Sequence, residues 1–246
     1  MDDKKAIENA FAEMAPKYEK VVDNELRRIW GWTYQEFVNQ LVQMTTIEEN
    51  DTVLDIATGT GVIPLRLSKE RANGNRYVGL DITPTMLQHA SQKVQQSPFQ
   101  KNIQLTCASA MVMPFRNDTF HQITCGLATH HMDTSVLIAE MIRVLRPGGR
   151  ITVADVGAGP SWKSPVIRFF LRLVAWAYFL PAEGFSRAWA EATAVSNMMT
   201  AEQWQSALER AGFVEVEVHK MDSRHAWAPA PIALKASKPN RVEAQP

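Results

Sequence analysis

A glycine-containing turn and an acidic residue further along the chain are the features most suited to binding a ligand. The run VLDIATGTG at residues 53–61 has the composition of a β-strand that ends in a turn with two glycines. Glycines let a ligand approach the backbone closely, and the helix that follows such a turn offers free N–H groups. Asp81 closes the next strand-like run, 20 residues after Gly61. In a doubly wound sheet, its carboxylate would lie beside the turn and accept hydrogen bonds from both ribose hydroxyls of a nucleoside.

Two further residues indicate which kind of nucleoside would fit. A dinucleotide-binding turn has the pattern Gly-x-Gly-x-x-Gly, and Pro64 stands at the third glycine position here. Asp55 lies inside the strand-like run, where a carboxylate would oppose a doubly negative pyrophosphate. That carboxylate would suit a ligand with an ammonium and a sulfonium, as in S-adenosylmethionine. The alternative is a structural Asp55 that is satisfied by nearby backbone N–H groups.

Adjacent histidines are the candidates for acid–base chemistry. His130 and His131 follow the fourth strand-like run, at the end of the sheet where doubly wound folds place their chemistry. Either imidazole could act as a general base if a methyl group is accepted by a hydroxyl, an amine or an acidic carbon. Asp133 is close in sequence and could orient one of them. The alternative is one histidine in packing and one facing solvent; His121 fits a structural role, and His225 is a weaker catalytic candidate.

The order of the elements explains how these residues would come together. Residues 52–156 alternate strand-like and helical segments, which indicates a parallel, doubly wound sheet with right-handed crossovers. Residues 214–221 and 231–236 could pair as an antiparallel hairpin. We therefore predict an α/β fold with a Rossmann-like, mostly parallel seven-stranded sheet and an antiparallel C-terminal hairpin. The five expected parallel strands are 52–57, 76–81, 102–107, 120–127 and 150–156.

A chain of 246 residues fits one large domain better than two small ones. Helical spacing of apolar residues near the start predicts N-terminal helices, and Thr200 and Gly212 bracket a helix near the end. We expect a single domain, 1–246. Its parts would be an N-terminal helical cap (1–48), a cofactor-binding core (50–156), an apolar helical lid (157–200) and a C-terminal helix with the hairpin (201–237).

Composition narrows the class of protein. The 26 Lys+Arg equal the 26 Asp+Glu, so the chain lacks the basic character that long nucleic-acid contacts require. Cys107 and Cys125 fit buried free thiols in a reducing compartment, and the polar N-terminus has no apolar signal core. We therefore expect a cytoplasmic protein. The most apolar later stretch, 165–181, contains two arginines and falls short of the ~20 residues of a spanning helix.

The segment after the fifth strand-like run is strongly apolar, and residues 157–200 can lie over the open end of the sheet. One interpretation is a lid over a hydrophobic acceptor, and the other is a set of core helices that need no ligand. Arg168 and Arg172, four residues apart, could face lipid headgroups, which would make 165–181 a peripheral membrane contact. The apolar positions are Val166, Phe169, Phe170, Leu173, Val174, Trp176, Tyr178, Phe179, Phe185 and Trp189.

Four segments together resemble a known family. VLDIATGTG, YVGLDITPTML, MPFRNDTFHQITCGLATHHMD and LRPGGRITVADV resemble, in order and spacing, the motifs of class I S-adenosylmethionine-dependent methyltransferases. The likeness is strongest to the ubiquinone/menaquinone biosynthesis C-methyltransferase group, whose entry segment is similar to AFAEMAPKYEKVVD here. The core motifs cover about residues 50–156, whereas 157–200 match loosely.

The resemblance implies a set of cofactor contacts. Ala57 stands where many members have glycine, and Ser109 stands where many have an aspartate that accepts from the adenine amino group. A serine hydroxyl can still accept that bond, but without charge assistance. The implied cofactor-binding residues are Tyr18, Asp55, Ala57, Thr58, Gly59, Gly61, Asp81, Ile82, Met86, Ser109, Ala110, Cys125, Gly126 and Leu127.

Together these features predict an enzyme that transfers a methyl group from S-adenosylmethionine to a small, hydrophobic or aromatic acceptor, such as a quinol precursor. Oxygen methylation of a small molecule in secondary metabolism is an open alternative. Pro64 and Asp55 disfavour an NAD-dependent oxidoreductase, and the zero net charge with the apolar insertion disfavours an RNA methyltransferase. A non-catalytic S-adenosylmethionine-binding protein is a further alternative, which would show no turnover with any acceptor. We expect no metal and no nucleic acid partner, and the oligomeric state stays open.

Overall fold

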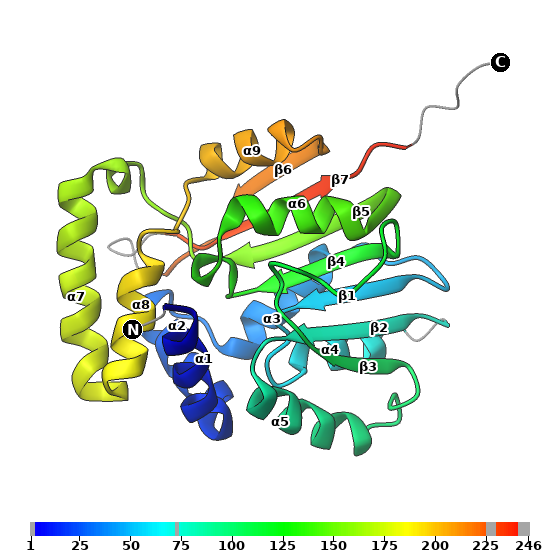
Figure 1. Cartoon of the computed structure of the whole chain (residues 1–246), viewed down its shortest axis with the longest axis horizontal. Helices are drawn as coiled ribbons and strands as arrows, with labels where there is room; N and C mark the ends of the chain where they lie inside the picture. The colour runs from blue at the N-terminus through cyan, green and yellow to red at the C-terminus, as the bar shows by residue number, and fades with distance from the viewer. Residues whose placement is uncertain (1–2, 72–73, 225–229, 241–246) are drawn as a thin grey trace.

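The computed structural model describes residues 3–71, 74–224 and 230–240, and it shows a seven-stranded sheet flanked by helices (Figure 1). The strand order is β3-β2-β1-β4-β5-β7-β6. Strands β1 to β5 pair in parallel, and β7 pairs antiparallel with both β5 and β6. The predicted fold class is confirmed. The strands are β1 (Thr52–Ile56), β2 (Arg76–Asp81), β3 (Ile103–Cys107), β4 (Phe120–Gly126), β5 (Leu145–Asp155), β6 (Val214–Lys220) and β7 (Ile232–Ser237).

The helices lie where the periodicity of the sequence predicts them. Thr200 accepts a hydrogen bond from the N–H of Gln203 and forms a capping box with it, which fixes the start of the last helix. The helices are α1 (Asp3–Met14), α2 (Tyr18–Ile29), α3 (Tyr34–Met44), α4 (Val62–Glu70), α5 (Pro84–Gln95), α6 (Thr134–Val144), α7 (Pro165–Glu183), α8 (Phe185–Ala194) and α9 (Ala201–Arg210). Short 3-10 turns occur at η1 (Ala15–Lys17), η2 (Thr129–His131) and η3 (Pro160–Lys163).

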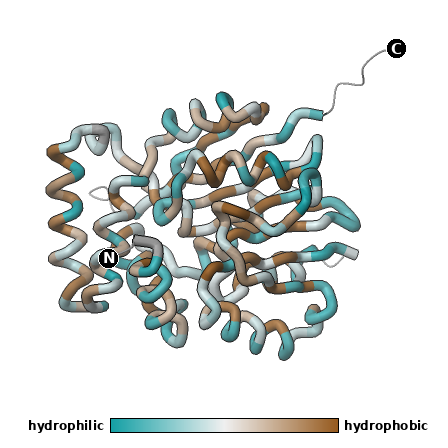
Figure 2. Tube along the Cα trace, viewed as in Figure 1, coloured by the Kyte–Doolittle hydropathy of each residue, from teal (hydrophilic) through white to brown (hydrophobic). Residues whose placement is uncertain are grey.

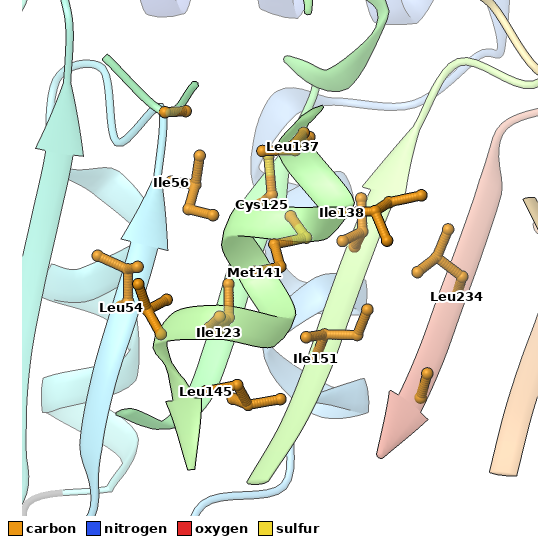
Figure 3. Close-up of a cluster of buried hydrophobic side chains, with 14 of the residues drawn as sticks. Leu54, Ile56, Ile123, Cys125, Leu137, Ile138, Met141, Leu145, Ile151 and Leu234 are labelled. Atoms are coloured by element: carbon orange, nitrogen blue, oxygen red, sulfur yellow. The ribbon is translucent and has the colours of Figure 1, made fainter. Parts of the chain in front are cut away.

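Alternating side chains of the central strands build a core on each face of the sheet. Leu54 and Ile56 belong to the cluster under α6 and α9, whereas Val53 belongs to the cluster with α3 and α4. Figure 3 shows Leu137 and Met141 of α6 lying against the strands of the first cluster. Because helices cover both faces of the sheet, the central strands β1 and β4 are almost wholly buried. The loops at their carboxyl ends are therefore attached to a packed core.

The fifth strand begins earlier than predicted. The sequence predicts a helix through Leu145 and a strand from Arg150, but β5 already starts at Leu145. Phe120 pairs with Leu145 and Gln122 pairs with Arg150, so the intervening Arg-Pro-Gly-Gly residues form an irregularity in the ladder. Gly148 has a φ of +74°, a conformation that favours glycine.

The lid segment is less embedded than a core helix. Figure 1 shows α7 at the outer edge of the molecule, with α8 between it and α1. Helix α7 has 19 residues and is, within the described ranges, the one helix long and apolar enough to cross a membrane by length and composition. The prediction that this stretch is too short to span is therefore wrong, because the helix continues beyond Pro181 to Glu183. None of its residues is buried, so the alternative of a core helix does not hold for α7.

Candidate active site

A cavity of about 880 Å³ lies at the carboxyl ends of the central strands, where doubly wound sheets bind ligands. Asp81 and Gly126, which close β2 and β4, line its inner part. Phe11 of α1 and Asn197 after α8 line it as well. The N-terminal cap and the lid segment therefore enclose a site that the sheet alone would leave open.

Asp81 ties the second strand to the glycine turn. Its Oδ2 accepts a hydrogen bond from the N–H of Gly59 at 2.8 Å, and its Oδ1 accepts from the N–H of Thr83 at 2.8 Å. The side chain is nearly buried yet lines the cavity, and burial raises the pKa of its carboxyl above the ordinary value. Each oxygen keeps lone pairs that can accept a further hydrogen bond from a ligand hydroxyl. Thr83 holds the N-cap position of α5, but its own side chain makes no cap hydrogen bond.

Strained backbone marks the ends of two strands that face the cavity. Ala57 and Leu127 both have a φ of +53°, which residues with a side chain rarely adopt. Both line the cavity, at the ends of β1 and β4. Such strain persists where the surrounding structure imposes it, and it clusters at functional sites. The conformation at Ala57 also gives the physical reason why glycine suits this position.

Asp55 lies beneath the glycine turn rather than on the cavity wall. The Thr124 hydroxyl donates to its Oδ1 at 2.7 Å, whereas Oδ2 is buried without a hydrogen-bond partner among the described residues. Burial raises the pKa of Asp55 to about 7. An unpartnered carboxylate oxygen under the turn fits a cationic ligand above it better than a pyrophosphate.

His130 is held by an acid that the sequence analysis did not identify. Its Nδ1 lies 2.6 Å from Oδ1 of Asp155, the last residue of β5. Burial alone would lower the pKa of His130, but the Asp155 carboxylate raises it above the ordinary value. The other Asp155 oxygen accepts from the N–H of Thr129 at 2.6 Å. His130 does not line the cavity, and the neighbouring Asp155 carboxylate favours its protonated form.

His131 lines the cavity directly. Its Nε2 lies 3.5 Å from Oε1 of Glu191, and its Nδ1 is buried without a hydrogen-bond partner in the part of the chain described. Burial, with the charge of His130, lowers the pKa of His131 below the ordinary value. The imidazole is therefore neutral at pH 7 and can accept a proton. Its ring packs edge-to-face with the Phe11 ring at a centroid distance of 5.2 Å.

Arg187 joins the histidines to the N-terminal cap. Its guanidinium lies 3.0 Å from Glu191 Oε1 and 3.2 Å from Glu25 Oε2, and it packs over the Phe11 ring at 5.3 Å. Burial would raise the pKa of Glu191, but Arg187 and His131 hold it well below the usual range. Burial outweighs Arg187 at Glu25 and raises its pKa to about 7. One buried guanidinium thus pairs with carboxylates from α2 and α8.

The same residues offer donor atoms of the kind that bind metals. One ligand atom each from His130, His131 and Glu191 lies within 4.8 Å of the others. Arg187 already places a positive charge 3.0 Å from Glu191, and a second cation there would be repelled. The arrangement is better suited to moving or holding a proton than to binding a cation.

A family profile now adds to this geometry. The profile described as the ubiE/COQ5 methyltransferase family matches residues 1–226. The chain belongs to the ubiE/COQ5 methyltransferase family. The predicted resemblance is confirmed, and so is the prediction of a methyltransferase enzyme. The family also supports S-adenosylmethionine as the methyl donor.

Several named proteins are similar in sequence. "Ubiquinone/menaquinone biosynthesis C-methyltransferase UbiE" of Geobacter sulfurreducens is 29% identical over 178 residues, 71% of this chain and 64% of that protein. The match thus spans slightly less than two thirds of that relative. "Demethylmenaquinone methyltransferase" of Lactiplantibacillus plantarum is 29% identical over 182 residues, 70% of this chain and 75% of that protein.

Solved structures share the fold at low sequence identity. A putative methyltransferase from Bacillus halodurans superposes with a TM-score of 0.61 at 21% identity, over 83% of this chain and all of that one. The [4+2]-cyclase SpnF superposes with a TM-score of 0.67 at 17% identity, over 94% of each chain. Since one of these proteins is named as a cyclase, the fold alone does not specify the reaction.

In this family member, ten of the fourteen predicted cofactor-binding residues line the cavity. The other four, Asp55, Thr58, Gly61 and Cys125, lie behind its wall. Cys125 is fully buried in the core under α6, as Figure 3 shows. The residues on the wall are Tyr18, Ala57, Gly59, Asp81, Ile82, Met86, Ser109, Ala110, Gly126 and Leu127. No ligand tests these assignments, so they stay predictions of contact.

The prediction that Asp133 orients one of the two histidines is wrong. Asp133 caps α6 by accepting from the N–H groups of Ser135 and Val136, and it orients neither imidazole. Asp155 and Glu191 lie beside the histidines instead, 25 and 60 positions along the chain. The signal for Asp155 was its place at the carboxyl end of a parallel strand, whereas nothing in the sequence places Glu191.

The other described histidines do not line the cavity. His121 accepts a hydrogen bond from the N–H of Thr52 at 3.0 Å, which agrees with its predicted structural role. His225 lies outside the described residues. Among the described residues, His131 is therefore the histidine that lines the cavity.

Proposed function

We propose that this chain transfers the methyl group of S-adenosylmethionine to a ring carbon of a small apolar acceptor, such as a quinol precursor. The observation that carries the proposal is one cavity lined by two unlike groups of residues. The turn at Gly59 and the Asp81 carboxylate, which are hydrogen-bonded to each other, line it, and so do a neutral His131 and the Phe11 ring that packs against it. The printed names of the relatives, ubiquinone/menaquinone C-methyltransferase and demethylmenaquinone methyltransferase, suggest the same class of acceptor.

The inner end of the cavity fits the methyl donor. S-adenosylmethionine supplies, when bound, an electrophilic methyl group on a positive sulfur. Asp81 would accept from the ribose hydroxyls, and Ile82 and Met86 would pack against the adenine. The Ser109 side chain would accept from the adenine amino group, and the unpartnered oxygen of Asp55 would favour the positive charge from beneath the turn.

His131 would serve as the general base of the site. As the acceptor's nucleophilic atom bonds to the methyl carbon, a proton must leave that atom. The imidazole of His131 lines the cavity, and its buried Nδ1 has no hydrogen-bond partner among the described residues, so this nitrogen would take the proton. Glu191 would stabilise the imidazolium that results, since its carboxylate lies 3.5 Å from Nε2. His130 and Asp155 form a pair that keeps its own charges and serves to position the segment.

The walls contribute geometry and dryness. Methyl transfer is an in-line displacement with a good leaving group, so the approach angle and the exclusion of water matter most. Phe11 and Tyr18 come from the N-terminal cap, and Met198 and Met199 come from the lid segment. The division into a cap (1–48), a core (50–156), a lid (157–200) and a C-terminal hairpin unit (201–237) belongs to the same proposal.

Oxygen methylation is the second candidate, because a neutral imidazole can equally deprotonate a phenol. One experiment distinguishes carbon methylation from oxygen methylation. Purified protein is incubated with S-adenosylmethionine and a short-chain demethylmenaquinol, kept reduced, and the product is analysed by mass spectrometry and NMR. A new ring C–CH₃ signal supports the proposal, and an O–CH₃ signal supports the alternative.

Calorimetry separates the cofactor from the acceptor in this test. S-adenosylhomocysteine should bind and NAD should not. Binding of S-adenosylhomocysteine without any methylated product would show that the acceptor is wrong. Absence of binding would overturn the cofactor assignment itself.

A further inference from the structure

Helix α7 carries an apolar stripe that faces solvent along its whole length. Phe169, Phe170 and Val174 are 59%, 60% and 63% exposed. With Val166, Leu173 and Leu180 they recur at helical spacing and define the outer stripe. Figure 2 shows this hydrophobic colouring on the outermost helix. Monomeric proteins rarely expose contiguous apolar patches of this kind unless they bind something.

The opposite side of α7 is fixed to the protein. Trp176 contacts Phe185 and Trp189 at ring distances of 5.2 and 6.0 Å, and the Tyr178 hydroxyl accepts from Arg28 at 2.8 Å. The helix is therefore anchored with its aromatic inner side on α8 and α2. The outer stripe faces away from the protein as a consequence of that packing.

The charges around the outer stripe are positive. Arg172 of α7 is exposed, and Arg28, which donates to Tyr178 on the anchored side of the helix, is exposed as well. Glu183 is the one acidic residue of α7, and it is ion-paired with Lys17 at 3.0 Å. An apolar stripe with a basic border fits a surface that is both oily and negatively charged, which is the character of an anionic lipid bilayer.

The anchoring of α7 favours a helix that lies on the bilayer over one that crosses it. Arg168 donates to the carbonyl oxygens of Trp162 and Ser196 at 2.7 and 3.1 Å. The start of α7 is therefore bound to the turn before it and to the residues that follow α8. A spanning helix would need lipid or other helices around its whole circumference. Here one side packs on α8, and only the other side is free.

The docked stripe would bring the cavity to the lipid phase. Arg168, Ser196 and Asn197 line the cavity, and they lie at the two ends of the segment that holds α7 and α8. We propose that α7 docks on anionic membranes through the outer stripe, so that a lipophilic acceptor can enter from the bilayer. The docking rests on the exposed stripe, the nearby arginines and the anchoring of α7, whereas the delivery of an acceptor rests on the proposed function.

Vesicle sedimentation tests the docking without the reaction. The protein is mixed with phosphatidylcholine vesicles with or without phosphatidylglycerol, at low and high salt. We expect binding that requires the anionic lipid and weakens with salt. Phe169→Glu with Phe170→Glu should reduce binding roughly tenfold or more, and Arg172→Glu should reduce it several-fold. Val214→Glu, an exposed apolar residue on β6, should have no effect.

Further measurements keep the outcomes distinct. S-adenosylhomocysteine affinity and the melting temperature should not change in these variants, since the stripe residues do not line the cavity. If the double variant at Phe169 and Phe170 does not fold, the test uses Arg172→Glu. Unchanged vesicle binding by that variant would contradict the docking. Wild-type protein that ignores anionic vesicles would overturn the docking. A dimer in sedimentation analysis that the double variant dissociates would assign the stripe to a second copy of the chain instead.

Discussion

The Asp81 carboxylate accepts hydrogen bonds from two backbone N–H groups and still faces the cavity. Its position at the end of β2 thus serves both the shape of the turn and the recognition of a ligand. Asp81→Ala should weaken binding of S-adenosylhomocysteine by roughly 1–3 kcal/mol, because charge-assisted hydrogen bonds are lost. Isothermal titration calorimetry measures this effect. Asp222→Ala, at an exposed site, is the control, and an equal affinity of both variants would refute the ribose assignment.

His131 and His130 have opposite environments although they are adjacent. Of the two, His131 lines the cavity, and its buried Nδ1 has no hydrogen-bond partner among the described residues. His131→Gln should lower kcat by about 10²–10⁴-fold while the affinity for S-adenosylhomocysteine stays the same, because a general base acts only in the reaction. His130→Gln should lower thermal stability more than kcat. Steady-state kinetics measures kcat in both variants. Full turnover by His131→Gln would contradict the assignment of His131 as the base.

The lowered pKa of His131 predicts how kcat changes at acid pH. Burial and the His130 charge lower the pKa of His131, so its base form persists below the ordinary value of 6.5. The kcat should therefore stay on its plateau as the pH falls through 6.5 and decline only at lower pH. In His130→Gln the repelling charge is gone, and the limb should move to higher pH. A pH profile of kcat that falls with a midpoint above 6.5 in the wild type would rule this out.

At the scale of elements, Arg187 holds α8 against the N-terminal cap. It pairs with Glu25 of α2 and Glu191 within α8, and it packs over Phe11 of α1. Arg187→Met should destabilise the fold by about 3–5 kcal/mol, because Glu191 would be left buried without its main partner. Urea unfolding measures the loss. Arg66→Met removes an exposed pair with Glu70 and should cost less than about 1 kcal/mol.

Glu25 gives that contact a pH dependence. Its pKa of about 7 in the fold exceeds the ordinary 4.5, so the folded state holds a proton that the unfolded state releases first. The stability that this proton contributes is complete below pH 4.5 and is lost as the pH rises to about 7. Glu25→Gln should flatten this part of the stability profile. A profile that is the same in Glu25→Gln and the wild type would contradict it.

At the scale of the whole molecule, the cavity needs four segments that are distant in sequence. Asp81 and Gly126 come from the sheet, Phe11 comes from the cap, and Asn197 comes from the end of the lid. The cap and the lid therefore close a site that the parallel strands open. A ligand bound there joins all four segments, so its effect should reach the stability of the whole domain.

Removal of the ligand tests this closure. S-adenosylhomocysteine at 100 times its dissociation constant should raise the free energy of unfolding by about 2.7 kcal/mol, since it binds only the folded state. Amide exchange should slow in α1 and around 193–199 as well as at the sheet. Protection confined to the sheet would show that the cap and the lid do not close over the ligand.

The sequence determined the fold and the donor end of the site. Strand and helix periods, the glycine turn and Asp81 are local signals, and parallel strands bring their carboxyl ends together without further information. The same reasoning placed His131 near the carboxyl ends of the strands and predicted that 157–200 is helical. These features could be predicted because each depends on neighbours within one or two elements.

The tertiary structure decided what surrounds the histidines and which surface is free. Asp155 and Glu191 take the role that sequence proximity suggested for Asp133, because a side chain pairs with whatever packs beside it. Arg187 pairs with Glu25, which is 162 positions away in the chain. The sequence also could not tell a core helix from an exposed one at α7, since both have the same apolar composition and only packing separates them.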